Sequence, residues 1–410
     1  MSARVFLDET FVGQLTPNVA TQTTEFEFDA SYAVQGARPV LGRWFEDHDI
    51  SPPRRFDGSP LPNYFRNLLP EGALRKLIAS RLGASSLPEY SMLLRLGGDL
   101  PGAIRVLSDE LDESPLDEQE RAARPPHDPF RFALTGVQPK LSLYEAADRL
   151  SVPVEGEQGF WIAKFGTPAY RELVQNEHTM LRWATRCGLN VPEHRVIRAR
   201  DIERLPEHFD SEQPALLVRR FDREDGGRRI HQEDFAQVFD IAPDDKYVSE
   251  HVDLDWVHYG SIGAVVFQLC GFDDFVEYMK RLAFLVLSGN GDAHVKNWAL
   301  VYPDTLRARL APVYDFVATV PYRDRPESPA MRWVQPDAPT LDPGKPLVDV
   351  TLDDLLAAAS YAEGADTAEV MEELERFIGV VRGEWSAVEP DAPPFTKKVV
   401  AAHLTSTKLH

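Results

Sequence analysis

Two carboxylates and one amide in the second half of the chain have the types and spacing that phosphoryl transfer requires. Asp292 and Asn297 lie five residues apart, and Asp315 follows 18 residues after the amide. Kinases hold Mg·ATP with this spacing: the first Asp takes or orients the proton of the attacking hydroxyl, while the Asn and the later Asp bind the metal ion. The pattern predicts a kinase in which Asp292 is the catalytic residue.

The same residues also have an ordinary structural interpretation. Short loops rich in Asp and Asn are mostly turns, and residues 289–291, Gly-Asn-Gly, favour a turn by themselves. Asp315 favours the functional interpretation, because an ionised carboxylate in an apolar stretch is costly without a partner or a metal ion. An apolar helix is predicted to end just before the loop, and residues 310–317 are predicted to form a buried strand that carries Asp315 back to it.

If the chain is a kinase, a phosphate-binding turn must lie upstream of this loop. Gly136, Val137 and Gln138 lie between two strand-like stretches, where their backbone N–H groups could face phosphates, and Lys140 would add positive charge. With a single glycine, an ordinary hairpin turn is an open alternative.

A lysine and a glutamate for the nucleotide phosphates follow in the expected order. Lys164 lies in an apolar strand-like stretch, where kinases place the lysine that grips the α- and β-phosphates and pairs with a helical glutamate. Glu177 lies on the apolar face of the next predicted helix, one turn before Leu181, and is the preferred partner. Glu172, nearer to the start of this helix, could instead be a solvent-facing residue that the helix dipole favours.

Two later stretches could contact the nucleotide base. Residues 216–223 form an apolar strand that runs into a charged turn, which suits a hinge with Phe221 packed nearby. Residues 231–237 are expected to begin a helix and to bring Gln232 towards the nucleotide. A plain core strand is an equally good interpretation of the first stretch, and the second is uninformative alone.

The order of these patterns predicts an α+β fold. Strand-like alternation dominates residues 3–50, and amphipathic helices are predicted over residues 350–385 and 394–405. Strands first and helices later indicate a two-lobed protein-kinase-like fold with a small N-terminal β-rich subdomain and a mainly helical C-terminal lobe. The predicted parts are residues 1–107 as N-terminal subdomain, 108–129 as acidic linker or loop, 130–235 as N-lobe-like part with the glycine loop, ATP lysine and hinge, and 236–410 as helical C-lobe with the catalytic loop.

The composition argues against several classes of protein. A net charge of −21 disfavours a large DNA- or membrane-binding face on this chain alone. No apolar run reaches transmembrane length and the start lacks a signal-peptide core, so a cytoplasmic protein is expected. Cys187 and Cys270 cannot build a disulfide framework or a zinc site, and both are expected to be buried thiols.

Taken together, these motifs resemble the HipA-type serine/threonine kinase toxins of bacterial toxin–antitoxin modules, over nearly the whole chain. The motifs that carry the resemblance are Asn67-Leu-Leu-Pro-Glu-Gly72, Leu96-Gly-Gly-Asp-Leu-Pro-Gly-Ala-Ile104, Gly136-Val-Gln-Pro-Lys-Leu141, Asn176-Glu177, Arg220-Phe-Asp-Arg223, His231-Gln-Glu-Asp234 with Lys246-Tyr247, Gly291 to Asn297, and Pro312-Val-Tyr-Asp315.

The resemblance implies a role for each matching residue. Asp292 matches the catalytic Asp and Lys164 the ATP-gripping lysine, while Asn297 and Asp315 match the Mg²⁺ ligands. The remaining matches are Arg219 and Phe221 at the nucleotide hinge, and Gln232 and His294 at nucleotide-contacting positions.

The resemblance also implies a biological role with ATP and Mg²⁺ as cofactors. Members phosphorylate a Ser or Thr of a protein, with aminoacyl-tRNA synthetases as the known substrate class, and the result is blocked translation and growth arrest or persistence. HipB-type helix-turn-helix antitoxins neutralise them, and the complex represses its own operon. A HipB-like partner is therefore expected, with operator DNA bound only through the antitoxin and with no membrane partner.

One departure from the family pattern concerns autophosphorylation. The glycine-rich loop of the family usually carries an autophosphorylated Ser three residues before its first Gly, sometimes with a second hydroxyl one residue before it. Ala133 and Thr135 occupy these positions here. Loop autophosphorylation must therefore use Thr135 or be absent. That Thr135 is only an ordinary turn residue is as good an interpretation as a phosphorylation site.

Two other functions are compatible with parts of the pattern. Small-molecule kinases that modify antibiotics also use an Asp-x4-Asn loop and a later Asp, although the N-terminal motif at residues 96–104 argues against this class. A non-catalytic corepressor acting only through its antitoxin is the second alternative. The intact Asp292, Asn297, Asp315 and Lys164 argue against it.

Overall fold

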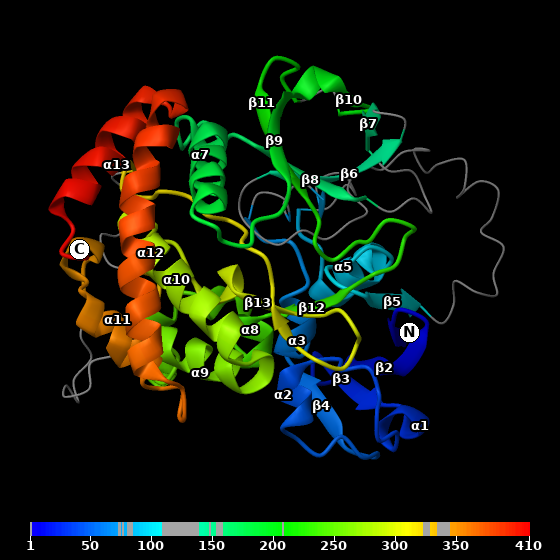
Figure 1. Cartoon of the computed structure of the whole chain (residues 1–410). Helices are drawn as coiled ribbons and strands as arrows, with labels where there is room; N and C mark the ends of the chain where they lie inside the picture. Colours follow the sequence, from blue (N-terminus) through cyan, green and yellow to red (C-terminus); the bar gives the residue numbers. More distant parts are fainter. Residues whose placement is uncertain are drawn as a thin grey trace. The chain divides into compact units, whose positions relative to one another are not determined.

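The computed structural model describes residues 2–72, 75, 78–79, 85–108, 139–146, 149–152, 159–206, 209–322, 329–333 and 345–410. The chain forms two compact units (Figure 1), unit 1 with Met1–Phe165, Ile197–Pro243 and Val301–Leu306, and unit 2 with Gly166–Val196, Asp244–Leu300 and Arg307–His410. Four of the predicted site residues lie outside the described residues: Thr135, Gly136, Val137 and Gln138.

The first sheet of unit 1 has five antiparallel strands in the order β4-β3-β2-β1-β5. Alternate residues of β1, Ala3, Val5 and Leu7, are buried, which is the period-two pattern of a sheet with one covered face. The strands are β1 (Ala3–Leu7), β2 (Thr10–Asn18), β3 (Thr23–Phe28), β4 (Arg55–Gly58) and β5 (Ile104–Ser108).

Short helices and aromatic side chains cover this sheet. Phe26 contacts Phe28, Phe45 and Phe65 with ring centroids 4.8 to 5.8 Å apart, in tilted or edge-to-face geometry. Such pairs add stability beyond the burial of their area. The helices are α1 (Ala30–Ala33), α2 (Arg43–Glu46), α3 (Asn63–Arg66) and α5 (Glu89–Leu96).

The second sheet has six strands in the order β10-β7-β6-β8-β11-β9, and all of them except β9 lie wholly in unit 1. Its central strands β6, β8 and β11 pair antiparallel. Its buried apolar residues join those of the first sheet in one hydrophobic cluster, so the two sheets share a core. The strands are β6 (Lys140–Ala146), β7 (Arg149–Ser151), β8 (Trp161–Phe165), β9 (His194–Arg198), β10 (Ile202–Glu203) and β11 (Pro214–Arg219).

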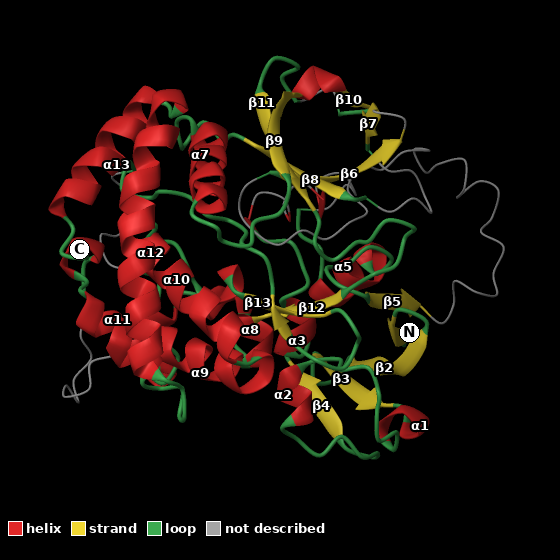
Figure 2. Ribbon diagram, in the orientation of Figure 1, coloured by secondary structure: helices red, strands yellow, loops and turns green. Residues whose placement is uncertain are grey.

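Helices dominate unit 2, as Figure 2 shows. Helix α10 is buried along residues 281–288, because α9, α12 and α13 all pack against it. Helix α12 is amphipathic, with Val370, Leu374, Phe377 and Val381 on its buried face. The helices are α7 (Leu173–Arg186), α9 (Tyr259–Cys270), α10 (Phe272–Ser288), α11 (Leu352–Ala359), α12 (Thr367–Val388) and α13 (Pro394–Ser406).

Three local predictions differ from the structure. Residues 350–385 contain two helices, α11 and α12, with non-helical chain between them. Residues 231–234 form strand β12 (His231–Asp234), and helix α8 (Phe235–Val238) begins only after it, because Asp234 and Gln237 form a capping box at that point. Residues 310–317 are mostly irregular rather than a strand, apart from the end of β14 (Arg309–Leu310).

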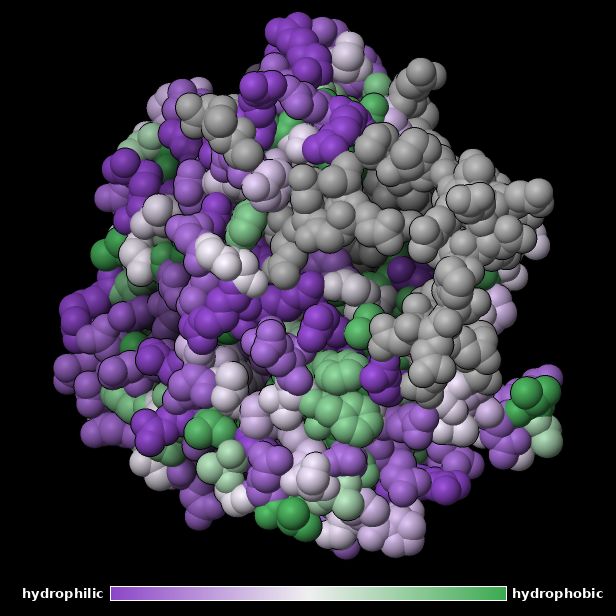
Figure 3. Space-filling model, turned by 90° about the vertical axis from the view of Figure 1, so that its right-hand side faces the viewer, coloured by the Kyte–Doolittle hydropathy of each residue, from purple (hydrophilic) through white to green (hydrophobic). Residues whose placement is uncertain are grey.

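Hydrophilic side chains cover most of the described surface on the face drawn in Figure 3, and hydrophobic residues occur there in small groups. In the part of the chain that the structure describes, no helix has the length and apolarity needed to cross a membrane. Cys187 is buried as expected, whereas Cys270 is only half-buried, because it ends helix α9.

Candidate functional site

The loop that carries Asp292 begins where helix α10 ends. Gly289 caps the helix with φ at 71°, and its N–H donates to the carbonyl of Val286. A Cβ atom at this position would lie 2.6 Å from a Val320 methyl group, so both the backbone conformation and the space require glycine. The predicted turn after a packed helix is confirmed, and it brings the chain to residue 292 in a fixed direction.

Backbone and side-chain hydrogen bonds hold Asp292 in place. Its N–H donates to Asn290 Oδ1 at 3.1 Å, and the N–H of Gly291 donates to Thr319 Oγ1 at 2.8 Å. The phenol of Tyr247 donates to Asp292 Oδ1 at 2.8 Å. The carboxylate is only half-buried, so it is both oriented and accessible.

Asn297 ends a short 3-10 turn, Val295–Asn297, that follows His294. Its N–H donates to the carbonyl of His294 at 2.9 Å, which fixes the backbone. Its side-chain Oδ1 is buried and has no hydrogen-bond partner among the described residues. Because buried polar atoms are nearly always satisfied, an amide oxygen without a partner is compatible with a ligand for a hard cation.

Asp315 lies on an irregular segment that is attached to the same loop. Its backbone is in the left-handed region, with φ at 55°, a conformation that costs energy and is enriched at functional sites. Just before it, Tyr314 donates its phenol hydrogen to the carbonyl of Lys296 at 2.9 Å. Since Lys296 directly precedes Asn297, this bond joins the two segments that carry the predicted metal ligands.

Asn176 on helix α7 fixes the same segment from the other side. Its amide donates to the carbonyl of Ala318 at 2.9 Å and accepts from the N–H of Ala318 at 3.1 Å. The side chain is fully buried, so one amide satisfies both backbone groups as a neighbouring strand would. Helix α7 itself packs on α12, where Trp183 donates to the carbonyl of Val381 at 3.0 Å.

Asn297 and Asp315 would supply only two oxygen ligands, which is the number that a protein typically gives to Mg²⁺ rather than to a metal ion coordinated by protein side chains alone. Mg²⁺ takes oxygen ligands and usually binds one or two protein groups together with water and substrate phosphates. Within the described ranges, no group of three or more His, Cys, Asp or Glu side chains could hold a metal ion. In unit 2, Asp292 and Asn297 lie on one loop, and the Tyr314–Lys296 hydrogen bond joins this loop to the segment of Asp315. A shared Mg²⁺ site of Asn297 and Asp315 stays a prediction.

Two lysines lie opposite each other in unit 1. Lys140 on β6 and Lys164 on β8 are partners in the antiparallel register, so their side chains project from the same face of the sheet. Both residues are buried, with 7% and 4% of their surface exposed. Like charges at directly opposed positions of a sheet repel each other.

The two candidate glutamates differ in exposure as the sequence pattern predicts. Glu177 is buried on α7, whereas Glu172 is half-buried at the helix N-cap, with φ at 58°. Lys164 belongs to unit 1 and Glu177 to unit 2. The pairing of these two residues stays a prediction.

The predicted hinge residues lie at and beyond the end of β11. The guanidinium of Arg219 lies over the rings of Phe160 and Trp161, at 5.4 and 5.5 Å from their centroids, and it also pairs with Asp225. Phe221 is half-buried. Gln232 and His294 are half-buried as well, the former on β12 of unit 1 and the latter in unit 2.

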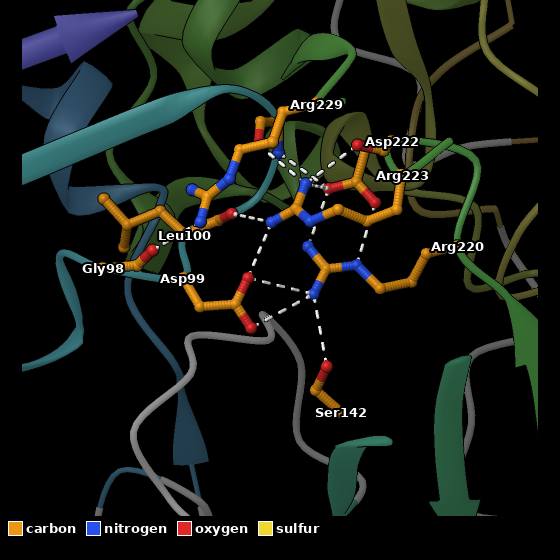
Figure 4. A network of polar contacts seen from close by, with 9 residues as sticks. Gly98, Asp99, Leu100, Ser142, Arg220, Asp222, Arg223 and Arg229 are labelled. Atoms are coloured by element: carbon orange, nitrogen blue, oxygen red, sulfur yellow. Dashed lines mark hydrogen bonds and ion pairs between the residues drawn. The ribbon is translucent and has the colours of Figure 1, made fainter. Parts of the chain in front are cut away.

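Beyond Arg219 the chain enters a buried ionic network (Figure 4). Arg220 forms a two-pronged salt bridge with Asp222, at 2.9 and 2.8 Å. Arg223 contacts Asp222 and also Asp99, at 2.9 and 2.7 Å. Arg229 donates to the carbonyl of Gly98 at 2.7 Å, which extends the network along the same loop.

The network attaches the segment after β11 to the loop between α5 and β5. Besides Asp99, this loop supplies the carbonyls of Leu100 and Gly102, which accept from Arg223 at 3.0 and 2.8 Å. The N–H of Gly102 donates to Asp222 at 2.8 Å. A Cβ atom on Gly102, whose φ is 73°, would lie 2.8 Å from the backbone nitrogen of Gln232, so only glycine allows this approach.

The charges of the network stabilise one another. Burial alone would raise the pKa of Asp222, but the Arg220 and Arg223 guanidinium groups outweigh burial and hold this pKa well below its usual range. Burial lowers the pKa of Arg229 to about 10, although Asp99 opposes the change. The sequence places Arg220 to Arg223 in a charged turn, and the structure shows instead that the turn is buried.

Glu233, on β12 beside Gln232, is a buried carboxyl group outside this network. Its oxygens accept from the N–H of Arg43, at 2.9 and 3.0 Å, and from the phenol of Tyr302. Burial raises the pKa of Glu233 to about 8, although these hydrogen bonds oppose the change. The folded protein therefore binds a proton here that the unfolded chain releases near pH 4.5.

This proton makes stability depend on pH. Between about pH 4.5 and 8 the folded state binds more protons at Glu233 than the unfolded state, so the contribution of Glu233 to the free energy of unfolding falls as pH rises. We expect the thermal midpoint of the wild type to fall relative to that of Glu233→Gln between pH 6 and pH 9. Equal pH dependence of the two proteins would contradict the raised pKa, and the exposed Glu363→Gln is the matched control.

Comparison with known proteins places the chain in a family. A profile of the HipA-like C-terminal domain matches residues 132–384, and a profile of the HipA N-terminal domain matches residues 3–107. "Putative kinase Y4dM" of Sinorhizobium fredii is 33% identical over 406 residues, which cover 96% of this chain and 94% of that protein. "Serine/threonine-protein kinase toxin HipA" of Shewanella oneidensis is 24% identical over 364 residues, which cover 81% of this chain and 78% of that protein.

A solved structure shares the fold. The HipA chain from a complex of Shewanella oneidensis HipA, HipB and their operator DNA superposes with a TM-score of 0.71 at 21% identity, over 98% of this chain and 96% of that chain. The sequence resemblance and the predicted α+β kinase-like fold are therefore confirmed. Both HipA profiles match the chain, in order along its length. The chain therefore belongs to the HipA family.

Proposed function

We propose that the protein is a Mg·ATP-dependent serine/threonine protein kinase and the toxin of a HipBA-type module. The observation that supports the proposal comes from one loop of unit 2: it carries an oriented, half-buried Asp292 and, five residues later, a buried Asn297 Oδ1 that lacks a hydrogen-bond partner among the described residues. Asp315 lies on the segment that Tyr314 ties to this loop. A structural turn alone has no need for that orphaned oxygen.

The residues have distinct roles in the proposed reaction. Asp292 accepts the proton of a Ser or Thr hydroxyl while the hydroxyl oxygen forms a bond to the γ-phosphorus of ATP. The bond from that phosphorus to the bridging oxygen breaks, and ADP leaves with the electron pair. Because positioning and charge compensation provide most of the rate enhancement in such reactions, a rigidly held Asp292 suits this role.

The remaining groups hold the nucleotide. Asn297 and Asp315 would bind Mg²⁺, which supplies positive charge to the β- and γ-phosphates when it is bound with ATP. Lys164 and Lys140 would contact the phosphates from β8 and β6. Arg219 and Phe221 would lie beside the adenine.

Replacement of the strand lysines tests this nucleotide site. We expect Lys164→Met to raise the KM for ATP at least about tenfold, because a charged hydrogen bond to phosphate contributes on the order of 1.5–3 kcal/mol. Lys140→Met should raise the KM for ATP by a smaller factor, because Lys164 and not Lys140 matches the ATP-gripping lysine of the family. The exposed Lys398→Met serves as the control, and an unchanged KM for ATP in Lys164→Met would contradict this site.

The substrate and partner are inferred from the relatives. The Shewanella oneidensis relative is named a serine/threonine-protein kinase toxin, and its solved structure contains HipB and operator DNA. We infer for this chain a protein substrate of the translation machinery, such as an aminoacyl-tRNA synthetase, and a HipB-like antitoxin. Induced expression should arrest growth, co-expression of a HipB-like antitoxin that binds this chain should relieve the arrest, and Asp292→Asn should not arrest growth.

Two alternatives make different predictions in the same experiments. A small-molecule phosphotransferase would consume ATP with an aminoglycoside-type acceptor and leave growth unaffected. A non-catalytic corepressor would arrest growth to the same extent, or not at all, with Asp292→Asn as with the wild type.

A further inference from the structure

Tyr247 and Asp292 come from separate segments of unit 2, 45 residues apart in the chain, and the Tyr247 hydroxyl lies 2.8 Å from Asp292 Oδ1. The donor is a neutral phenol and the acceptor is the carboxylate oxygen Oδ1. A neutral donor can fix the orientation of a carboxylate without forming an ion pair with it. This contact therefore orients Asp292.

The backbone around Tyr247 is held by the same segment that holds the catalytic loop. Arg332 donates to the carbonyl of Ser249 at 2.8 Å, and the N–H of Ser249 contacts the carbonyl of Ala330 at 3.4 Å. The N–H of Ala330 in turn donates to the carbonyl of Gly291 at 2.9 Å. Residues 330–332 thus connect Ser249, two residues after Tyr247, to Gly291, the residue before Asp292.

The ring of Tyr247 is also fixed by its neighbours. The imidazole of His294 meets the ring edge-on, with centroids 5.2 Å apart and planes at 86°. The Nζ atom of Lys246 lies 5.7 Å from the centroid. Since His294 is two residues after Asp292, the catalytic loop contacts Tyr247 both through the ring and through the hydroxyl.

An aspartate needs such a contact in order to present one particular oxygen. The χ2 torsion of Asp is broad and nearly two-fold, so rotation of the carboxylate exchanges Oδ1 and Oδ2 at little cost. We propose that Tyr247 is a positioning residue for Asp292: its hydroxyl fixes Oδ1 and thereby the direction in which the carboxylate faces the substrate hydroxyl. This inference rests on the proposed kinase function and adds a residue to it.

The test removes one hydroxyl group. Tyr247→Phe should lower kcat about 10- to 100-fold, because a small misplacement of a reacting group has effects of this size. The KM for ATP should stay within about twofold of the wild type, because the contacts that hold the nucleotide remain. The thermal midpoint and its rise on addition of Mg·ATP should change little, since the phenol is half-buried and its ring remains.

A matched control separates positioning from the general loss of a hydroxyl. Tyr278 is buried in the same unit and donates to the carbonyl of Tyr259 at 2.7 Å. Tyr278→Phe should lower the thermal midpoint and leave kcat at low temperature within about twofold of the wild type. An equal loss of kcat in both variants would overturn the proposed role of Tyr247.

A double-mutant cycle shows whether Tyr247 acts through Asp292. In the Asp292→Asn background, the residual rate of label transfer should be the same with Tyr247 and with Phe at position 247, because residues that act as a unit are not additive. The same fold loss in both backgrounds, or a Tyr247→Phe kcat equal to that of the wild type, would overturn the inference. An inactive wild type would instead overturn the kinase assignment, and this inference with it.

Discussion

Asp292→Asn should lower the rate of phosphoryl transfer by about 10²- to 10⁴-fold while the fold and the binding of ATP survive. The amide keeps the size of the side chain and still accepts the hydrogen bond from Tyr247, but it cannot take a proton from the attacking hydroxyl. Loss of a positioned general base lowers rates by about 10²- to 10⁴-fold. Steady-state transfer of labelled phosphate gives kcat, and thermal midpoints with and without Mg·ATP report folding and nucleotide binding.

The control for this variant is a carboxylate that is not part of the site. Asp353 is exposed on helix α11, and Asp353→Asn should transfer phosphate at the wild-type rate. If Asp292→Asn kept more than about a tenth of the wild-type kcat, Asp292 would not be the catalytic residue. An unchanged thermal midpoint of Asp292→Asn would show that its loss of activity does not come from unfolding.

Asp222→Ala is expected to have the largest effect on stability. Removing this carboxylate leaves Arg220 and Arg223 with buried positive charge, and the N–H of Gly102 loses its acceptor. Breaking a buried ionic network by removing one partner costs about 3–5 kcal/mol. Urea unfolding followed by tryptophan fluorescence should show this loss, together with a higher KM for ATP, because the network lies directly after Arg219.

An exposed ion pair provides the comparison. Asp47 pairs with Arg43 and keeps 53% of its side-chain surface exposed, so Asp47→Ala should change the free energy of unfolding by at most about 1 kcal/mol. Asp222→Asn, which retains one oxygen acceptor, should lie between these two variants. If Asp222→Ala were no less stable than Asp47→Ala, the network would not hold the hinge segment.

The catalytic loop was predictable because its geometry is local. Gly289 after an apolar helix predicts a helix end and a turn, and this turn places Asp292 on a loop whatever the rest of the chain does. Glu177 was predictable for a similar reason, since helical periodicity alone places it on the buried face of α7. Both predictions needed only residues within a few turns of one another.

Contacts between distant segments were not predictable from the same patterns. Arg223 meets Asp99 across 124 residues, and the periodicity around neither residue contains this information. The bond between Tyr247 and Asp292 was missed in the same way, although Lys246-Tyr247 belongs to a motif of the family resemblance. The irregular course around Asp315 was missed because apolar residues favour a strand, whereas a positive φ at that residue interrupts one.

Phosphoryl transfer to protein is the measurement that tests the central claim most directly. Purified protein with γ-labelled ATP and Mg²⁺ is incubated alone and with purified aminoacyl-tRNA synthetases, beside Asp292→Asn, and the labelled residue is identified by mass spectrometry. The expected result is phosphoserine or phosphothreonine on a protein, including residues 131–141 of this chain if Thr135 is an acceptor, and far less labelling with Asp292→Asn. Failure of the wild type to bind Mg·ATP, or equal labelling by both proteins, would contradict the account.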